Sequence, residues 1–433
     1  MKKALPLLTA LLASVFGNQS ALAGTFGIYD SRSQAMGGAA VAVGSTGMAA
    51  GHNPALLGLY DEDEDTTNNG RYYLPFIVGN LSQVAIDGLE LLDDELDIAF
   101  DNALNSYNSD PQPELARTAS DAALALEEGL TGIANKDIYF SAFIPIIAVA
   151  EPAKKGGGGF YLGSRIEGGG RSTIPDDDIA LFEDYVQALD NVAQGGYWAD
   201  VHPELFNAEE GYTDFDPPPL NDPFDQIDSR ADLRGLIINE VAVAGALGFD
   251  RDNLRVAVGV TPKVMQVRVF DESREVSSDR LEVENSTKPY LMFNADIGVV
   301  VEFESGWRLA YVGKDLLRRT FTSNTSARIE LDTKHRMGAA YIQPNWQIGV
   351  DYDMQANLPV ATEKAGQFLS FGGEYTVFER FAFRAGYRYD TDSHIAATTS
   401  FGVGASWASA ELSLSYVTSK DEQGAALQLG FAF

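Results

Sequence analysis

The chain contains no cysteine among its 433 residues. That absence excludes a disulfide framework, a thiolate metal site and a thioredoxin-like redox function. Basic residues are also scarce, because 31 Lys and Arg stand against 62 Asp and Glu and give a formal net charge of −31. A chain this acidic lacks the basic footprint of a nucleic-acid-binding protein, so we expect no direct binding of nucleic acid.

Long apolar runs are missing beyond the amino terminus. There, Lys2 and Lys3 precede an apolar run over 4–16, and small residues follow up to Ala23. This pattern predicts a secretory signal peptide over residues 1–23, cleaved near Ala23. No later stretch approaches the ~20 apolar residues that a membrane helix needs. The protein is therefore expected to be exported, and a membrane location would require a β-barrel.

The carboxyl terminus carries an apolar side chain at every second position. Leu427, Leu429, Phe431 and Phe433 lie on one face of a strand, because side chains alternate with a period of two. Soluble chains seldom end on such a strand, since termini fray into solvent. A barrel must pair its last strand with its first to leave no edge in lipid. The ending resembles the signal by which barrel-assembly machinery recognises outer-membrane barrels.

Period-two segments fill the second half of the chain. Segments 346–355 and 381–390 are each apolar on one face and ionisable on the other, which is typical of a lipid-facing wall around a wet lumen. We predict an all-β fold, a transmembrane antiparallel β-barrel of about fourteen strands over residues 69–433. The expected strands are 71–79, 137–150, 158–170, 234–249, 254–271, 289–303, 306–313, 327–342, 346–355, 367–377, 380–390, 396–407, 410–419 and 424–433.

The connectors differ in length on the two rims, as short periplasmic turns and long outer loops do. Two long ones are acidic. Within 80–136, the segments 82–105 and 114–135 repeat apolar residues at helical spacing and predict a helical hairpin above the rim. The other, 171–233, is rich in Pro and Gly and predicts a loop that caps the barrel. Both are interpreted as lid or packing elements, with docking of a partner as the alternative.

A segment of small residues lies between the signal peptide and the first strand, over 24–68. Gly37 and Gly38 allow a tight approach of backbones. Asn53-Pro54 favours a turn, because the asparagine side chain can bond its own backbone. The segment is too short to fold alone, so we expect it to occupy the barrel lumen.

The combination of "AMGG", "NPALL", a signal peptide and a terminal aromatic strand resembles the FadL-type family of outer-membrane transporters for hydrophobic compounds. Within that group the likeness is closer to chains labelled conjugal-transfer TraF-like proteins. The resemblance implies a fourteen-stranded barrel plugged by an amino-terminal hatch. It also implies that Asn53, Pro54 and Ala55 form the hatch motif, with Gly37 and Gly38 as its packing glycines.

Two hypotheses of function follow. The first is passive uptake of a hydrophobic or amphipathic small molecule, gated by the hatch; no nucleotide-binding Gly-rich loop is present, so no energy source or cofactor is expected. The second is a conjugal-transfer or surface assembly factor that acts through its acidic extracellular loops. In both, outer-membrane lipids and lipopolysaccharide surround the barrel.

Candidate site residues in the lumen are few. Arg384 and Arg388 share one strand face and could hold a carboxylate through bidentate hydrogen bonds. The alternative, which we favour, is that they pair with lumen acids such as Asp351, Asp353 or Glu374 and hold the barrel together.

No enzyme is expected, and no metal site. The four histidines lie apart in the sequence among polar or loop residues, so we predict that each is solvated rather than catalytic. They are His52, His202, His335 and His394.

Overall fold

The computed structural model places most of the chain, and the predicted signal peptide 1–23 lies outside the described residues, as does part of 24–68. The described residues are 26–59, 70–93, 96–153, 156–208, 217–275, 288–324, 328–357, 360 and 365–433.

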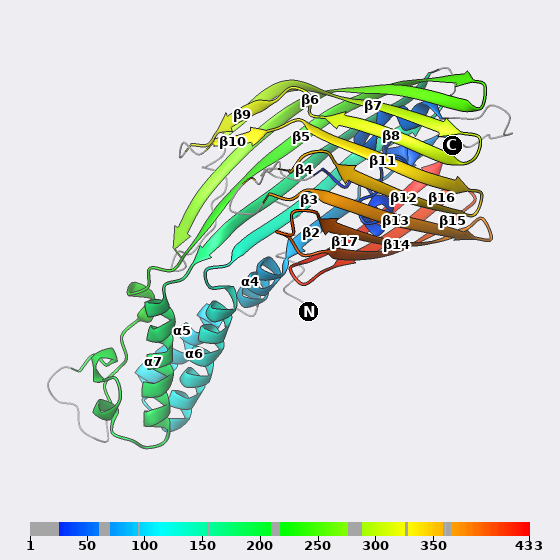
Figure 1. Ribbon diagram of the computed structural model, residues 1–433. Coiled ribbons are helices and arrows are strands. Elements are labelled where there is room, and N and C mark those ends of the chain that lie inside the picture. Colours follow the sequence, from blue (N-terminus) through cyan, green and yellow to red (C-terminus); the bar gives the residue numbers. More distant parts are fainter. Residues whose placement is uncertain are drawn as a thin grey trace.

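Within these residues the main sheet is a closed antiparallel barrel (Figure 1). It comprises fifteen strand segments, of which β1 and β2 both pair with β3 on one side and with β17 on the other. These two are therefore parts of one interrupted strand, and the barrel has fourteen strands, which confirms the predicted fold class. The segments are β1 (Arg71–Tyr73), β2 (Ile77–Ser82), β3 (Asp137–Glu151), β4 (Gly157–Thr173), β5 (Arg230–Arg251), β6 (Leu254–Glu275), β7 (Lys288–Phe303), β8 (Trp307–Lys314), β11 (Lys334–Gln343), β12 (Trp346–Asp353), β13 (Phe368–Val377), β14 (Phe381–Asp390), β15 (Thr398–Trp407), β16 (Ala410–Thr418) and β17 (Glu422–Ala432).

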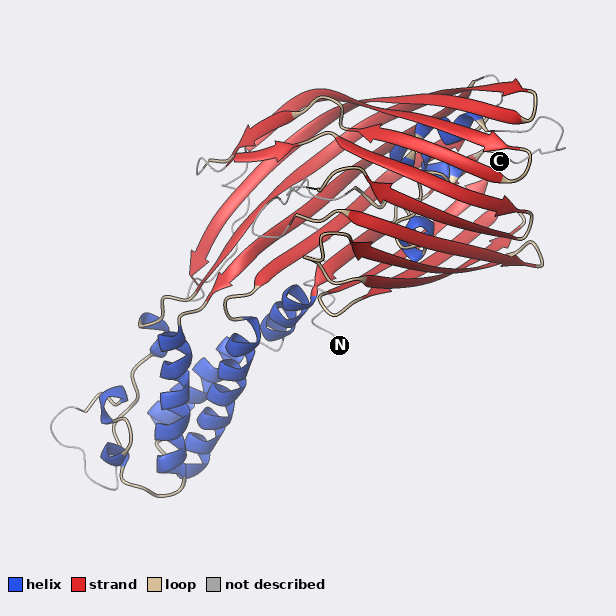
Figure 2. Cartoon of the chain, viewed as in Figure 1, coloured by secondary structure: helices blue, strands red, loops and turns tan. Residues whose placement is uncertain are grey.

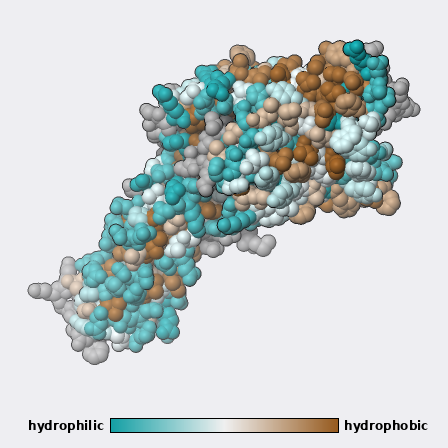
Figure 3. All heavy atoms as spheres, viewed as in Figure 1, coloured by the Kyte–Doolittle hydropathy of each residue, from teal (hydrophilic) through white to brown (hydrophobic). Residues whose placement is uncertain are grey.

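The strands alternate as the sequence predicts. On β12, Ile348 is 50% exposed on the outer face whereas Asp351 is 1% exposed on the inner face. On β17, Leu427 and Leu429 point outward and Gln428 lies buried between them. Apolar residues accordingly gather over the barrel wall in Figure 3. This outer band is the surface that a lipid environment would cover.

The last strand closes the barrel. The main chain of Phe433 exchanges two hydrogen bonds with Gly70, of 2.9 and 3.1 Å, just before β1 begins. The turns that join β5 to β6, β7 to β8, β11 to β12, β13 to β14 and β15 to β16 have two or three residues each and lie on the rim where β17 ends. We call this the short-turn rim and the opposite one the long-loop rim.

One predicted strand, 327–342, is wrong in part. Its first residues form β10 (Arg328–Leu331), which pairs only with β9 (Arg319–Thr322) in a separate two-stranded sheet. The barrel strand β11 begins after a turn in which the Thr333 main chain donates to the Asp332 side chain. Apolar residues occur at alternate positions on both sides of this turn, and for this reason the sequence pattern predicted a single strand.

A group of helices extends from the long-loop rim (Figure 1). The first insertion, predicted as a helical hairpin, holds three helices, because the predicted first arm is divided into helices over 83–93 and 96–109. The second insertion, predicted as a loop over 171–233, contains a helix of 18 residues that the prediction missed. The helices are α4 (Gln83–Asp93), α5 (Leu96–Ser109), α6 (Pro113–Ile133) and α7 (Asp176–Ala193).

Helix α7 follows directly from its residues. Three aspartates, Asp176 to Asp178, occupy its first turn, where their negative charge interacts favourably with the positive end of the helix dipole. Phe182, Tyr185, Leu189 and Val192 then form one buried face. This face packs with α5, α6 and three short 3₁₀ turns around a second apolar core, and we call the assembly the helical head.

The helical head ends in irregular structure around three 3₁₀ turns. These are η3 (Trp198–Asp200), η4 (Pro203–Leu205) and η5 (Pro223–Asp225). Among the described residues, none of the helices has the length and apolar character needed to span a bilayer.

Residues 26–59 lie inside the barrel, in the half nearer the short-turn rim, and we call them the inner segment (Figure 2). They form short helices with no strand in the sheet. The elements are α2 (Ser31–Ala35), η1 (Thr46–Met48), α3 (Ala49–His52) and η2 (Pro54–Gly58).

Candidate functional site

The inner segment fills the lumen near the short-turn rim. Tyr29, Met36, Met48 and Leu57 are each 0% exposed, and they belong to one apolar cluster with inward residues of the barrel wall. Because the cluster is shared, the same contacts bury the inner segment and pack the lumen near the short-turn rim.

Gly37 is the point where the inner segment comes closest to strands β13 and β14. Its φ of 67° lies in the left-handed region, and a Cβ there would stand 2.8 Å from the carbonyl oxygen of Phe371. On the wall side, a Cβ at Gly386 would stand 2.1 Å from the Gly37 nitrogen. Glycine is required on both sides, because bare backbones lie against each other here. Neighbouring Gly38 also has a positive φ, of 86°.

Asn53, Pro54 and Ala55 form a compact turn against β6 and β7. The Asn53 Oδ1 atom accepts a 3.1 Å hydrogen bond from the Ala55 nitrogen and so caps η2, while its Nδ2 donates to the Val41 carbonyl at 2.9 Å. A Cβ at Gly298 would lie 1.8 Å from Asn53 Oδ1. The three residues of the predicted motif thus fit a wall surface that has no side chain at that point.

Polar side chains of the wall hold the backbone of the inner segment. The Asp351 Oδ2 atom accepts hydrogen bonds of 2.7 and 2.9 Å from the main-chain nitrogens of Ala40 and Val41. Arg336 donates to the Gly38 carbonyl at 3.2 Å. The backbone groups of a segment without regular structure need such partners, because unpaired buried amides are costly.

The same pattern continues around the barrel. Arg308 donates to the Ala42 carbonyl at 3.0 Å, and Thr261 donates to the Ala50 carbonyl at 3.2 Å. Lys314 donates to the Gly51 carbonyl. The inner segment is therefore held by side chains from several strands rather than by sheet pairing.

Arg384 lies on the inner face of β14 and binds protein groups. Its Nε lies 2.5 Å from Oε2 of Glu374, and its Nη1 donates to Ser413 at 2.7 Å. Glu374 also accepts from Arg32 of the inner segment at 2.9 Å. Arg384 is thus linked to the inner segment through a shared carboxylate.

Arg388 lies on the same face of β14, two inward positions further along the strand. Its Nη2 is 2.9 Å from Oε2 of Glu422, and its guanidinium stands 4.8 Å from the centre of the Phe368 ring. The sequence suggested Glu374 as a lumen partner but did not suggest Glu422. Asp351 and Asp353, the other acids considered, contact the inner segment and Arg336 instead.

His52 is buried, so the prediction that it is solvated is wrong. Its Nε2 lies 3.4 Å from Oδ2 of Asp30, and both side chains are 1% exposed or less. Asp30 also accepts hydrogen bonds from Ser33 and Ser45. Burial raises the pKa of the Asp30 carboxyl, whereas the charge on His52 and the hydrogen bonds lower it. The lowering dominates, and the pKa of Asp30 lies well below its usual range.

The other histidines lie at or near the surface. His335 is half-buried and stacks on Tyr311, with its Nδ1 2.7 Å from the tyrosine hydroxyl. The His394 Nδ1 lies 3.2 Å from the Ala365 carbonyl. His202, in the helical head, contacts two carboxylates.

A group of buried charges, which was not predicted from the sequence, lies on the side of the inner segment that faces the long-loop rim. Arg165 bridges Glu240 at 3.1 Å and Asp315 at 3.2 Å. Lys263 contacts Asp296 at 2.8 Å and Asp315 at 2.7 Å. We call these five residues the charge layer. All are at most 3% exposed, and each buried charge has an opposite partner, as its desolvation requires.

Lys314, the residue before Asp315 of the charge layer, contacts the inner segment. The Lys314 Nζ atom lies 3.7 Å from the centre of the Tyr29 ring and 5.2 Å from that of Phe26. The partners come from strands far apart in sequence. The available signal was a charged residue at an inward position within each of the strands β4, β5, β6 and β7.

An apolar layer lies beyond the charge layer, toward the long-loop rim. It is built from inward residues of β5, β6 and β7 and is covered by the β9–β10 hairpin, whose Phe321, Ile329 and Leu331 are 3% exposed or less. The wall residues are Leu236, Ile238, Met265, Val267, Val269 and Met292. From the long-loop rim to the short-turn rim, the lumen therefore contains the apolar layer, then the charge layer, then the inner segment.

A polar cavity of about 360 Å³ opens beside the inner segment near the short-turn rim. Arg32, Glu374 and Arg384 line it together with residues of the turns and of the first and last strands. Its lining carries both charge signs, so it is suited to water and polar groups rather than to an apolar ligand.

Comparison with known proteins gives one family match. Residues 50–353 match the family model described as "F plasmid transfer operon, TraF, protein". No curated protein matches the chain.

Several solved structures of channels are similar to the chain. The P. putida toluene transporter TodX is 11% identical over 93% of this chain and 97% of that one, with a TM-score of 0.43. The Ralstonia pickettii toluene transporter TbuX is 11% identical over 94% and 98%, with a TM-score of 0.46. The CymD monoaromatic hydrocarbon channel is 11% identical over 95% and 98%, with a TM-score of 0.43.

Proposed function

The chain belongs to the family of F plasmid transfer operon TraF proteins, and from its closed barrel and filled lumen we propose that it is an outer-membrane channel for passive uptake of a hydrophobic or amphipathic small molecule. The placement in the outer membrane rests on the barrel itself. Within the described residues its sheet has no open edge, and large apolar side chains such as Phe293 and Phe383, 71% and 55% exposed, cover its outer face. In water that surface would be costly, whereas lipid covers it favourably.

One observation carries the proposal of gated uptake. The inner segment occupies the lumen without contributing a strand to the barrel sheet, so it can be displaced while every strand pair stays intact. Its anchors are separate side-chain contacts such as Arg32 with Glu374 and Asp351 with the Ala40 nitrogen. In this proposal the inner segment is a hatch, and the part of it that packs closely against the barrel wall consists of Gly37, Gly38, Asn53, Pro54 and Ala55.

The order of the layers supports a hydrophobic solute. In this proposal a molecule that enters from the long-loop rim first meets the apolar layer, where the buried Phe321 and Leu331 of the hairpin pack against the wall residues. Displacing these side chains exposes a surface that an apolar solute covers without an unpaired polar group. The charge layer and the inner segment then form the barrier before the short-turn rim, which faces the periplasm in this proposal.

A reversible cross-link tests whether the inner segment moves. The hydroxyl oxygens of Ser31 on α2 and Ser415 on β16 are 3.1 Å apart, so Ser31→Cys with Ser415→Cys gives two thiols within reach of a disulfide. The chain has no cysteine of its own, so no other disulfide competes. We expect uptake of a radiolabelled apolar aromatic solute by expressing cells to fall to background when the pair is oxidised and to recover after reduction.

The two single variants, Ser31→Cys and Ser415→Cys, are the matched controls and should transport under both conditions. Full uptake by a double variant shown by mass spectrometry to be completely oxidised would contradict a moving hatch.

A second function is favoured by the helical head, which has an apolar core separate from that of the barrel and stands beyond the long-loop rim. A folded unit in that place provides a surface for another protein, as a conjugal-transfer or surface assembly factor would need. Replacing 83–133 and 176–227 with short linkers separates the two functions. Loss of mating with normal solute uptake would favour assembly, and loss of uptake alone would favour transport.

A further inference from the structure

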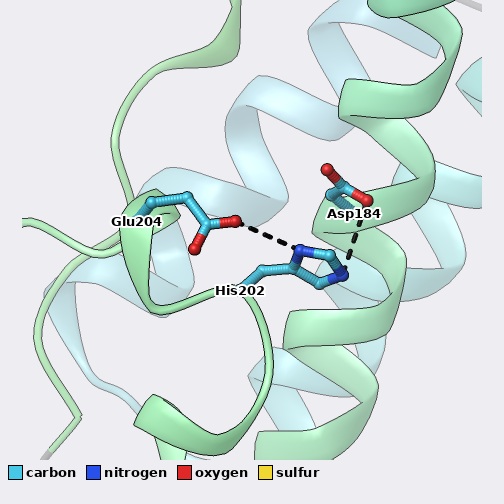
Figure 4. A group of neighbouring side chains, drawn as sticks. All are labelled: Asp184, His202 and Glu204. Carbon is cyan, nitrogen blue, oxygen red and sulfur yellow. Dashed lines mark hydrogen bonds and ion pairs between the residues drawn. The ribbon is translucent and has the colours of Figure 1, made fainter.

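The helical head holds a histidine between oxygen atoms from two elements. The His202 Nε2 atom faces helix α7, where it lies 3.4 Å from Oδ1 of Asp184 and 3.3 Å from Oε1 of Gln187 (Figure 4 shows the aspartate). On the other side of the ring, Nδ1 lies 3.2 Å from Oε1 of Glu204. Asp184 and Gln187 are three residues apart on α7, so both side chains project from one face of the helix.

The amide of Gln187 has a fixed direction. Its nitrogen lies 3.4 Å from Oε1 of Glu183 and donates to that carboxylate, which leaves the amide oxygen turned toward His202. The exposed Glu204 carboxylate accepts hydrogen bonds, so its position beside Nδ1 suits an imidazole that carries a ring proton on that atom. In that tautomer the lone pair of Nε2 is on the side of Asp184 and Gln187.

A positive charge between Nε2 and the two oxygen atoms that face it would satisfy all three, and a bound cation supplies one. The spacing fits a metal ion, because ligands bound at about 2.0–2.1 Å in a tetrahedron lie roughly 3.3 Å from one another. The arrangement on the other side of the ring fits as well. A metal-bound histidine usually donates its second ring N–H to a carboxylate, which fixes the tautomer and orients the ring. Glu204 holds that position here.

The backbone of His202 is consistent with a side chain held in place. Its φ of 45° and ψ of 55° are left-handed, a conformation that residues other than glycine adopt at a cost, and Pro203 follows directly. This conformation directs the imidazole back onto α7 rather than into solvent.

We propose that His202 Nε2, Asp184 and Gln187 bind a divalent transition-metal ion of the Zn²⁺ type, with Glu204 orienting the histidine and water completing the coordination. One nitrogen with two oxygens suits zinc better than calcium, which prefers oxygen ligands alone. The ion joins the turn before η4 to the middle of α7 and stabilises the end of the helical head. The site is independent of the solute pathway, which lies inside the barrel.

Isothermal titration of the full-length detergent-solubilised protein, without an affinity tag, with Zn²⁺ tests the proposal. The chain has no cysteine and four histidines, so few other strong ligands compete. We expect one Zn²⁺ per chain and at least a tenfold loss of affinity in His202→Ala and in Asp184→Asn. Glu204→Gln should weaken binding less, because it keeps an acceptor for the imidazole but loses the charge.

His394→Ala is the matched control, since His394 lies in a loop of the barrel and contacts a main-chain carbonyl. It should bind as the wild type does. Zn²⁺ should also raise the unfolding temperature of the helical head in the wild type and not in His202→Ala. Equal affinity of the wild type and His202→Ala, or no stoichiometric binding at all, would overturn the proposal.

Discussion

Arg32 and Glu374 join the inner segment to the barrel wall, with the Arg32 Nε atom 2.9 Å from the Glu374 carboxylate and both side chains at most 14% exposed. The same carboxylate binds Arg384 at 2.5 Å and Gln347 at 2.6 Å. One wall residue therefore connects the inner segment to two neighbouring strands, beside the polar cavity at the short-turn rim.

Glu374→Gln should loosen the inner segment and leave the barrel assembled. Hydrogen bonds to charged groups contribute about 1.5–3 kcal/mol, which corresponds to a shift of roughly 10- to 100-fold in the balance between seated and displaced forms. More frequent ion-conducting events in planar bilayers would report the change. Glu422→Gln is the control, because it removes an Arg–Glu pair between two wall strands, with Arg388. Equal opening in both variants would refute a special role of Glu374.

Acid should unseat the inner segment only at low pH. The pKa of Asp30 is lowered in the folded protein, so the stability that its charge contributes is present above the ordinary aspartate pKa of about 3.9 and is lost as the pH falls below it. Conductance should stay low from pH 7 to pH 5 and rise below about pH 4.

Asp30→Asn tests the assignment, because it should raise conductance already at pH 7. Asp252→Asn, in the exposed turn between β5 and β6, is the control and should behave as the wild type. A pH profile unchanged by Asp30→Asn would show that another group sets the acid response.

The strands could be predicted from the sequence because each has one face toward the apolar exterior and the other toward the lumen. On β12 and β17 a period of two is imposed by the apolar exterior and the polar lumen, and it is visible in every second residue. The same rule failed at Ile329 and Leu331. They continue the outward pattern of β11 in sequence, yet the turn at 332–333 lets them fold over the lumen.

The contacts of the lumen could not be predicted in the same way. Arg165 and Asp315 are 150 residues apart in sequence and meet only because the barrel closes. Arg384 with Glu374 was within reach, since both lie on inward positions of neighbouring strands. His52 seemed isolated, because its partner Asp30 becomes a neighbour only when α2 and α3 pack inside the barrel. Helix α7 was missed because Pro and Gly in the flanking residues outweighed its apolar spacing.

Removing Phe433 should impair assembly. The Phe433 main chain exchanges two hydrogen bonds with Gly70 and completes the seam between the last and first strands. We expect a severalfold lower yield of heat-modifiable barrel in the outer membrane, because an unpaired strand end is costly in lipid. Phe378→Ala is the control, since Phe378 is 83% exposed in a short turn. A normal yield of the shortened chain would contradict an assembly signal at this residue.

Gly298→Ala should disturb the hatch motif from the wall side. An added Cβ would lie 1.8 Å from Asn53 Oδ1, so the turn of Asn53 and Pro54 must shift away from β7. Overpacking of this kind costs about 1–3 kcal/mol, and here the cost falls on the seated form of the inner segment. Ion conductance should therefore rise. Gly245→Ala adds the same methyl group on β5, where no described residue other than its chain neighbours comes within 4 Å, and should conduct as the wild type. If both variants assembled and neither conducted more than the wild type, contact between Asn53 and the wall would not be what closes the lumen.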